Sequence, residues 1–462
     1  MKKILAFLFA AVAFAACGQV PEPVLPENFD PEKFTVRDLV ECTPRGGAPN
    51  FYKKLESGAP EVRIAYFGGS VTAQNGWRVY SREYFQSLYP DTKVTEINAA
   101  IGGTATDLGA FRCWHDVIKE NPDLVYIEFA CNDHGTKPLV LRKNLEGIVR
   151  QIWDANPRTD IIFIYVVTAG ETELMLEGKM MRSASVMEDI ADYYGIPTIN
   201  FGASLKPMLE EGTLVMKSET GPLARVSGDE LNINAEAVCN EDGALPVNAD
   251  GVVPFSGDGV HPYENTGHVL YESSIERSMP LIKDAAIRAR AHAMPAPMVA
   301  GCLSDVATVS FADPRVSVTG EWIRDEADDP VSGPFSNRSD EFFTFEPGAE
   351  VSFKFRGSSA AIYDIIGPES CSLLVSVDGS EPRTVNRIDG YCTYHRLALL
   401  DLCSKMDPEA VHTVSIKVSD TAPDKRGILF EHNRGDYDDN PEKYAPCHYF
   451  AGCIFIAGEI VE

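Results

Sequence analysis

The chain has 462 residues, of which 44% are hydrophobic and 24% are charged, and its formal net charge is -27 at pH 7. This length exceeds one typical domain, and the composition is that of a globular protein with enough apolar material for two cores. The acidic balance argues against nucleic acid or anionic lipid as a partner, since phosphate contacts need clusters of Lys and Arg. It is compatible with a neutral polysaccharide and serves solubility equally well.

The N-terminus has the pattern of a targeting segment. Lys2 and Lys3 precede an apolar run from Ile4 to Phe14 that is too short to span a bilayer. The small residues before Cys17 resemble the lipobox of bacterial lipoproteins, although Phe14 replaces the usual leucine. The resemblance implies cleavage before Cys17, acylation of its thiol and anchoring in the bacterial cell envelope, on the periplasmic or the surface side of the outer membrane. Ordinary secretion, with Cys17 removed or free, is the alternative.

Composition and periodicity divide the chain into a series of segments. We expect a signal peptide at residues 1–17, a tether and lead-in at 18–57, an α/β domain at 58–293, a linker at 294–303 and a β-sandwich domain at 304–462. The tether is rich in Pro and Glu, and the linker begins with a Met-Pro-Ala-Pro run. The 11 cysteines permit disulfides outside the cytosol, but their pairing stays open.

Strand and helix patterns alternate between Glu61 and about Gly202. The expected strands are short apolar runs at Val62–Phe67, Val94–Ile97, Leu124–Ala130, Ile161–Thr168 and Ile196–Phe201. Amphipathic segments at helical spacing separate these runs. The pattern predicts a parallel five-stranded sheet covered by helices on both faces, with ligands bound beyond the carboxyl ends of the strands. Ser70, Gly103 and Asn132 all follow such ends.

The rest of the chain has two further patterns. Residues 203–257 lose their periodicity, which indicates either a lid that shapes the substrate site or a surface excursion. A helix rich in Ala and Arg is expected to follow, ending near Ala293. Beyond residue 303 apolar residues alternate with period two, as in Val351–Phe355 and Val414–Val418. Short alternating strands without helices between them predict an antiparallel sandwich or jelly roll.

Residues from separate motifs together supply the groups of a serine hydrolase. Ser70 lies at a turn from strand to helix that presents its hydroxyl at the rim of the sheet. His261 can remove the proton of this hydroxyl, while Asp258, three residues earlier, holds the imidazole in the required tautomer. The side chain of Asn132, the backbone near Gly103 and the amide of Ser70 can stabilise an oxyanion. This set indicates ester hydrolysis without a cofactor or a metal.

Each of these motifs also has a simpler interpretation. The turn at Ser70 could be a phosphate cradle, but the chain lacks G-x-G-x-x-G and G-K-[ST]. It also lacks the G-x-S-x-G of the α/β-hydrolase elbow. Asn132 with its neighbour could be a turn or a helix cap. The rival is a metal site, which would leave Ser70 unexplained and would use Asp133, His134, Asp258 and His261.

These residues match the blocks of the SGNH/GDSL hydrolase family, which the stretch from about 60 to 293 resembles. The resemblance implies that Ser70 is the nucleophile of the first block, and that Gly103 and Asn132 are the oxyanion donors of the second and third. It implies that Asp258 and His261 complete the triad in the fifth block. It also implies a flavodoxin-like sheet.

The chain departs from the family pattern at two positions. Gly69 replaces the Asp of Gly-Asp-Ser, and Ala130 replaces the Gly of Gly-x-Asn-Asp. Neither change removes a catalytic group, although both could reshape the rim of the pocket. The wider run, including Arg45 to Asn50 and Gly76-Trp77-Arg78, resembles a bacterial branch of secreted SGNH proteins.

We therefore expect an SGNH-type serine esterase that deacetylates an O-acetylated carbohydrate through an acyl-enzyme. The choice of a carbohydrate as the substrate rests on analogy, because a surface lipoprotein with an appended sandwich domain resembles polysaccharide-degrading systems. The expected partners are an acetylated glycan or another small ester, and the membrane through the lipid at Cys17. One alternative is a lipase or thioesterase with the same triad. Another is a non-catalytic glycan-binding surface lipoprotein whose function lies in residues 304–462.

Residues outside these motifs have further expected roles. Arg112 is expected either to contact substrate or to be a salt-bridged arginine. His268 is expected to pack near the site. The aromatic residues of the second domain could form a face that stacks on sugars, but aromatic residues in strands more often belong to a core. These residues are Tyr363, Tyr391, Tyr394 and Trp322.

Overall fold

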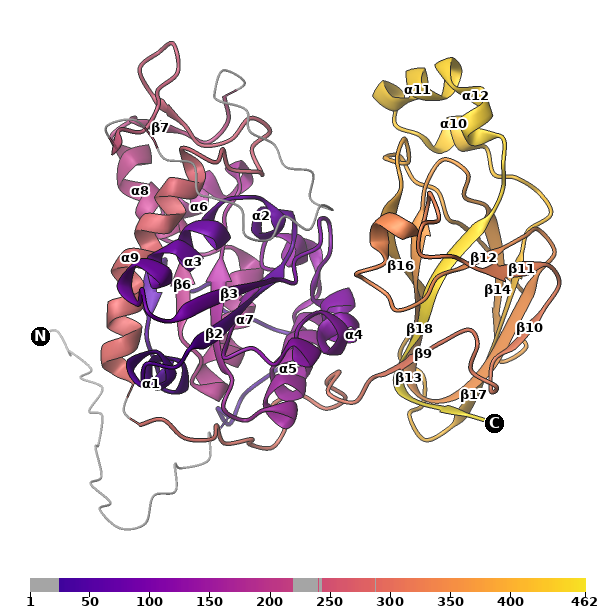
Figure 1. The fold of residues 1–462 in the computed structure, drawn as a ribbon, viewed down its shortest axis with the longest axis horizontal. Helices are drawn as coiled ribbons and strands as arrows, with labels where there is room; N and C mark the ends of the chain where they lie inside the picture. The colour runs from indigo at the N-terminus through magenta and orange to yellow at the C-terminus, as the bar shows by residue number, and fades with distance from the viewer. Residues whose placement is uncertain (1–24, 219–239, 241–242, 287) are drawn as a thin grey trace, which may run out of the picture.

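Figure 1 shows the fold of the chain in a computed structural model. The structure describes residues 25–218, 240, 243–286 and 288–462. Cys17, the signal peptide and the start of the tether lie outside the described residues, so the lipid anchor stays a prediction. Within the described residues, every helix is too short or too polar to cross a bilayer.

A six-stranded sheet forms the centre of the first domain, in the order β1-β6-β5-β4-β2-β3. Five of its strands are parallel: β2 (Glu61–Gly68), β3 (Lys93–Asn98), β4 (Leu124–Glu128), β5 (Asp160–Tyr165) and β6 (Thr198–Asn200). This arrangement confirms the predicted flavodoxin-like sheet. The sixth strand, β1 (Cys42–Thr43), pairs antiparallel with β6 and is too short to produce a sequence pattern.

Helices cover both faces of this sheet (Figure 1). On one face α4, α5 and α7 pack side by side, and on the other α3 packs against α9. The long helices are α1 (Pro49–Glu56), α3 (Trp77–Leu88), α4 (Thr106–Asp116), α5 (Pro138–Ala155), α7 (Arg182–Tyr194), α8 (Gly202–Glu210) and α9 (Gly267–Ala285). The short ones are α2 (Ser70–Ala73), α6 (Thr172–Leu176), η1 (Ile118–Glu120), η2 (Asn132–Gly135) and η3 (Ala169–Glu171). The central strands β4 and β5 and the neighbouring β6 are buried along their whole length, as expected of a parallel sheet covered on both faces, whereas β2 and β3 are partly exposed at their starts.

The second domain is antiparallel, which confirms the predicted all-β fold. Its strands are β9 (Ala307–Val309), β10 (Ser317–Thr319), β11 (Trp322–Arg324), β12 (Phe343–Phe345), β13 (Glu350–Ile366), β14 (Ser372–Val377), β15 (Arg383–Asn386), β16 (Arg396–Cys403), β17 (Val411–Val418) and β18 (Tyr449–Val461). The long strand β13 pairs with β17 along its first half, with β16 along its second and with β18 on its other side. Short helices lie at η5 (Gly333–Phe335), α10 (Lys425–Ile428), η6 (Glu431–Asn433), α11 (Arg434–Asp439) and α12 (Pro441–Tyr444).

The region from 203 to 293 differs from the sequence-based expectation. Residues at the start of this region form α8. The sequence did not indicate this helix, because Pro207 lies inside it and proline is typical of loops. The short strands β7 (Leu214–Val215) and β8 (Val253–Pro254) then pair in parallel. The helix α9 ends at Ala285 and not near Ala293, because the ring of His292 stacks on Trp153 with centroids 4.5 Å apart. Tertiary packing here overrides the helical propensity of an Ala- and Arg-rich sequence.

The segment between the domains is held against α5. Both carboxylate oxygens of the buried Glu146 accept hydrogen bonds from the backbone of this segment, from Met298 and from Val299 at 2.9 Å. The backbone of Leu303 runs directly over Gly147, whose Cβ, if present, would lie 2.5 Å from the Leu303 carbonyl carbon. The linker is therefore a packed strap along α5.

An apolar cluster joins the two domains. Ile101, Leu108 and Phe111 of the first domain pack in one buried cluster with residues of β13 and β18. The rings of Phe111 and Phe455 stack at 5.1 Å with an interplanar angle of 10°. This contact lies on the α4 side of the first domain, where Figure 1 shows the two domains side by side.

We predict that Gly147→Ala lowers the free energy of unfolding by about 1–3 kcal/mol, because the added methyl group displaces the strap backbone. Urea unfolding followed by circular dichroism measures the change. Gly435→Ala in α11 is the control, since no described atom lies within 4 Å of its Cβ position. There, alanine should be neutral or slightly stabilising. A Gly147→Ala protein as stable as the wild type would contradict the packed strap.

Candidate active site

The structure brings Ser70, His261 and Asp258 together at the carboxyl edge of the parallel sheet. Ser70 follows β2 as the first residue of α2, and the other two lie on the loop before α9. Ser70 Oγ lies 2.7 Å from His261 Nε2, and His261 Nδ1 lies 2.7 Å from Asp258 Oδ2. This chain of hydrogen bonds gives the serine hydroxyl a base that can take its proton, and gives the base an orienting carboxylate.

The loop around Asp258 keeps its carboxylate charged. Oδ1 accepts the backbone N–H groups of Val260 at 2.8 Å and His261 at 2.9 Å, and the hydroxyl of Ser256 at 3.0 Å. Partial burial acts against ionisation, but the hydrogen bonds from His261 and these amides hold the pKa of Asp258 well below its usual value. An ionised Asp258 favours the tautomer with the proton on Nδ1, which leaves Nε2 free to accept the Ser70 proton.

The predicted oxyanion residues lie on the neighbouring loops. Asn132 begins η2 after β4, and its side chain packs directly on Gly69, where an added Cβ would overlap its amide oxygen. This contact explains why the second position of the first block is glycine in this chain. Gly103 lies on the loop between β3 and α4 with a left-handed φ of 72° and is exposed. The amide of Ile101 on this loop donates to Gly68 at 3.1 Å, which links the loop to the serine strand.

Asp133 fastens the loop of Asn132 to the loop of Gly103. Its Oδ2 accepts the amide of Thr106, the first residue of α4, at 3.1 Å. Burial raises the pKa of Asp133 to about 6, and hydrogen bonds from the two threonines nearby oppose this shift. The adjacent His134 turns to the carbonyl of Cys131 at 3.1 Å. Asp133 and His134, two residues of the alternative metal site, are thus bonded to backbone groups. Within the described part of the chain, no three His, Cys, Asp or Glu side chains gather as metal ligands.

A buried carboxyl group under the nucleophile was missed by sequence reasoning. Glu128 ends β4, and its Oε2 accepts the hydroxyl of Thr72 in α2 at 2.8 Å and lies 3.4 Å from the amide nitrogen of Gly69. Burial raises the pKa of Glu128 to about 8, so the neutral acid predominates at pH 7. The signal was present in the sequence, because an acidic residue interrupts the apolar run of a central strand.

Two buried arginines hold the loops of the site from behind. Arg112 is fully buried in α4, bonds Asp116 at 2.7 Å and donates to the carbonyl of Gly68 at 3.1 Å and to that of Ala99. It is thus a salt-bridged structural residue and not a substrate contact. Arg78 donates to the carbonyls at the end of α2, including that of Thr72 at 3.1 Å.

The other residues considered from sequence make no hydrogen bond to the triad in the described part of the chain, although His268 packs near His261 as expected. His268 is fully buried in α9, where burial lowers its pKa to about 3 and Nδ1 accepts the amide of Trp77 at 3.2 Å. Tyr363 belongs to the core between the domains. Tyr391 and Tyr394, by contrast, are 53% and 52% exposed.

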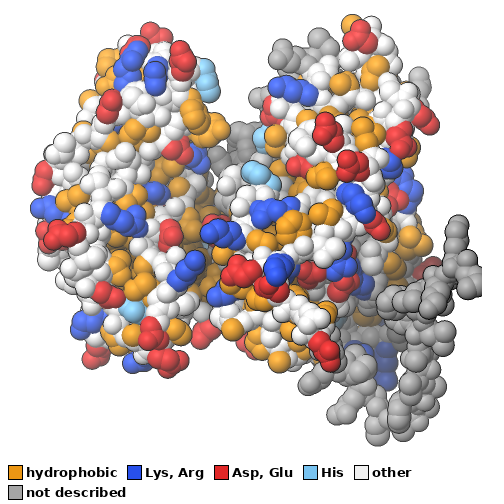
Figure 2. All heavy atoms as spheres, turned by 180° about the vertical axis from the view of Figure 1, so that it is seen from behind, with side chains coloured by type: hydrophobic (Ala, Val, Ile, Leu, Met, Phe, Trp, Pro, Cys, Tyr) orange, Lys and Arg blue, Asp and Glu red, His pale blue; other side chains and the backbone are white. Residues whose placement is uncertain are grey.

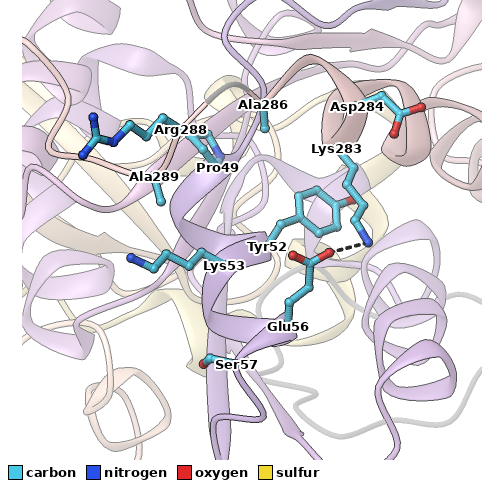
Figure 3. Close-up of a pocket in the computed structure, with 10 residues that line it drawn as sticks. All are labelled: Pro49, Tyr52, Lys53, Glu56, Ser57, Lys283, Asp284, Ala286, Arg288 and Ala289. Atoms are coloured by element: carbon cyan, nitrogen blue, oxygen red, sulfur yellow. Dashed lines mark ion pairs between the residues drawn. The ribbon is translucent and has the colours of Figure 1, made fainter. Parts of the chain in front are cut away.

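A cavity lies elsewhere in the first domain, away from the triad. It has a volume of about 650 Å³ and lies between α1 and the end of α9 (Figure 3). Its lining includes Tyr52, Lys53 and Arg288, and the ion pair between Lys283 and Glu56 closes one side. None of the triad or oxyanion residues lines it. The triad instead lies open to solvent, with 36% of the His261 side chain exposed.

Comparison with known proteins gives a family match for one part of the chain and fold matches for most of it. Residues 66–237 match the model of the GDSL-like lipase/acylhydrolase family, which confirms the resemblance for the first domain. A two-domain esterase active on acetylated mannans, solved with mannopentaose, is 17% identical and aligns over 93% of this chain and 100% of its own, with a TM-score of 0.66. A second structure, also of a two-domain esterase active on acetylated mannans, gives 17% identity, 92% and 100% coverage and a TM-score of 0.65.

An acetylxylan esterase from Geobacillus stearothermophilus is 19% identical over 47% of this chain and 94% of its own, with a TM-score of only 0.32. No curated protein is significantly similar to the chain in sequence. The likeness to the mannan esterase establishes a shared fold that includes both domains.

We predict that Glu128→Gln removes a pH dependence from the stability of the protein. Because the folded protein binds this proton up to about pH 8 and the ordinary glutamate value is 4.5, wild-type stability should fall as the pH rises between these values. The difference in unfolding free energy between wild type and variant should therefore change by up to about 1.4 kcal/mol per pH unit. Urea unfolding at pH 5, 6, 7 and 8 measures it. A difference that stays constant across this range would contradict a neutral Glu128.

Proposed function

From the match of residues 66–237 to the model of the GDSL-like lipase/acylhydrolase family, we propose that this protein is a serine esterase that removes acetyl groups from an O-acetylated carbohydrate. The observation that carries the esterase part is the hydrogen-bonded chain from Ser70 through His261 to Asp258. Its groups stand at the distances that proton transfer requires.

The geometry supports an acyl-enzyme mechanism. Ser70 Oγ attacks the ester carbonyl while its proton passes to His261 Nε2, and Asp258 stabilises the imidazolium. The oxyanion of the tetrahedral intermediate accepts hydrogen bonds from the amide of Ser70, the backbone at Gly103 and the side chain of Asn132. The imidazolium then protonates the departing sugar alcohol. Water, deprotonated by His261, attacks the acyl-enzyme, and acetate leaves as Ser70 recovers its proton.

Open access to the triad favours a polymeric substrate with a small acyl group. Asp258 and His261 side chains are 35% and 36% exposed. Among described residues, the large exposed hydrophobic side chains lie outside the loops at 68–76, 99–105, 129–136 and 256–263 that surround the site. A lipase needs an apolar surface for its acyl chain, and these loops do not offer one.

The appended domain supports a carbohydrate substrate. The structure with the same two-domain fold is an esterase active on acetylated mannans. Acidic and basic side chains are interspersed over the face that Figure 2 shows, as suits a neutral ligand.

We predict that the purified protein releases acetate from acetylated mannan or acetylated xylan, and cleaves p-nitrophenyl acetate at least about tenfold faster than the octanoate, because the site lacks an acyl groove. Ser70→Ala should lower the turnover by at least about 1000-fold. Ser87→Ala, an exposed serine on α3, is the matched control and should keep wild-type activity.

Each alternative has its own outcome in this assay. Wild-type turnover no greater than that of Ser70→Ala would favour a non-catalytic glycan-binding protein. Faster cleavage of octanoate than of acetate would favour a lipase or thioesterase.

A further inference from the structure

An arginine of the second domain reaches the loop that carries Gly103. Arg338 follows η5, and its Nη2 donates a hydrogen bond of 2.8 Å to the carbonyl of Ala100. The carbonyl of the preceding residue, Ala99, accepts from Arg112 of the first domain. Two guanidinium groups, one from each domain, therefore hold consecutive peptide units just before the oxyanion glycine.

Arg338 is buried and belongs to the same charged network as Arg112. It is 6% exposed, and its Nη1 lies 4.0 Å from Oδ2 of Asp116, the carboxylate that also pairs with Arg112. Burial opposes ionisation of Asp116, but its bond from His115 and the charges of the two arginines keep its pKa below the usual value. A guanidinium buried at a domain boundary is costly unless its partners are fixed. Its placement on a backbone carbonyl therefore makes the position of Ala100 depend on the second domain.

Apolar packing adds to this dependence. Ile101, the residue after Ala100, is 1% exposed and belongs to the buried cluster that includes Phe342 and Phe455 of the second domain. The loop thus makes one hydrogen bond to the β domain, at Ala100, and packs one side chain against it, that of Ile101.

Gly103 lies in a turn that Thr104 closes, because the hydroxyl of Thr104 donates to the carbonyl of Ile101 at 2.8 Å. The φ of Gly103, 72°, is left-handed, and no described atom lies within 4 Å of its Cβ position. The direction of its backbone is therefore set by this turn and by the preceding peptides of Ala99 and Ala100, which the two arginines hold. Oxyanion donors must be placed within roughly 0.5 Å to act in the transition state.

We propose that Arg338 is a positioning residue through which the β domain holds the oxyanion loop, so that the second domain is a part of the catalytic machinery. This inference rests on the proposed esterase function. It explains why the domains share a buried polar network directly behind the site. The esterase reaction itself is unchanged, since Arg338 acts through the backbone of residues 100–103.

The test compares Arg338→Met with Arg338→Lys in the full chain, using p-nitrophenyl acetate. Methionine keeps an apolar stem for packing but removes the donors, so kcat should fall about 10- to 100-fold with KM within about twofold of wild type. Lysine keeps the charge and has its N–H donors on a single nitrogen, and it should recover part of the loss. Inhibition by a boronic acid, which forms a tetrahedral adduct on the serine, should weaken in parallel with kcat.

Controls separate this proposal from folding and from the proposed function. Arg356→Ala removes another arginine of the β domain, one that bonds Glu459 at 2.7 Å, and should keep wild-type kcat. Thermal melting shows which variants are folded at the assay temperature. A folded Arg338→Met with kcat within twofold of wild type overturns the proposal, and so does failure of both Arg338 variants to fold. If wild-type turnover does not depend on Ser70, the esterase function itself is wrong.

Discussion

The hydrogen bond between Ser70 and His261 joins residues that are 191 positions apart, and it forms only if the sheet edge and the loop before α9 are both held in place. Proton transfer tolerates little variation in this distance. The parallel sheet meets the constraint at one end, because β2 delivers Ser70 directly to its carboxyl edge. The other end depends on Asp258, whose side chain organises the short loop by accepting its amides.

Buried polar groups, in addition to apolar packing, support the loops of the site. Glu128 lies under α2, and Arg78 lies at the end of α2. Arg112 connects the end of β2 to the loop after β3, because it donates to carbonyls in both. Such groups cost desolvation energy, and a packed apolar core would be at least as stable. Their advantage is direction, because a hydrogen bond fixes a carbonyl where apolar contact does not. The arrangement therefore exchanges stability for precise placement of catalytic loops.

Sequence patterns were sufficient for the parallel strands and for the antiparallel domain, because burial on one or both faces leaves a periodic trace. They could not show β1, which is two residues long, or the end of α9, which depends on the distant Trp153. Ser70, Asn132 and Gly103 stood at strand ends, where a topology rule places ligands. Arg338 carried no such signal, since its role arises from the contact of two domains.

The most direct test of the account is the rate at which a fluorophosphonate modifies the protein, with the modified peptide identified by mass. The account predicts one adduct, on Ser70, that forms at least about 1000-fold more slowly in His261→Ala, because the imidazole activates the hydroxyl. Modification of another residue, or an equal rate in His261→Ala, would contradict it.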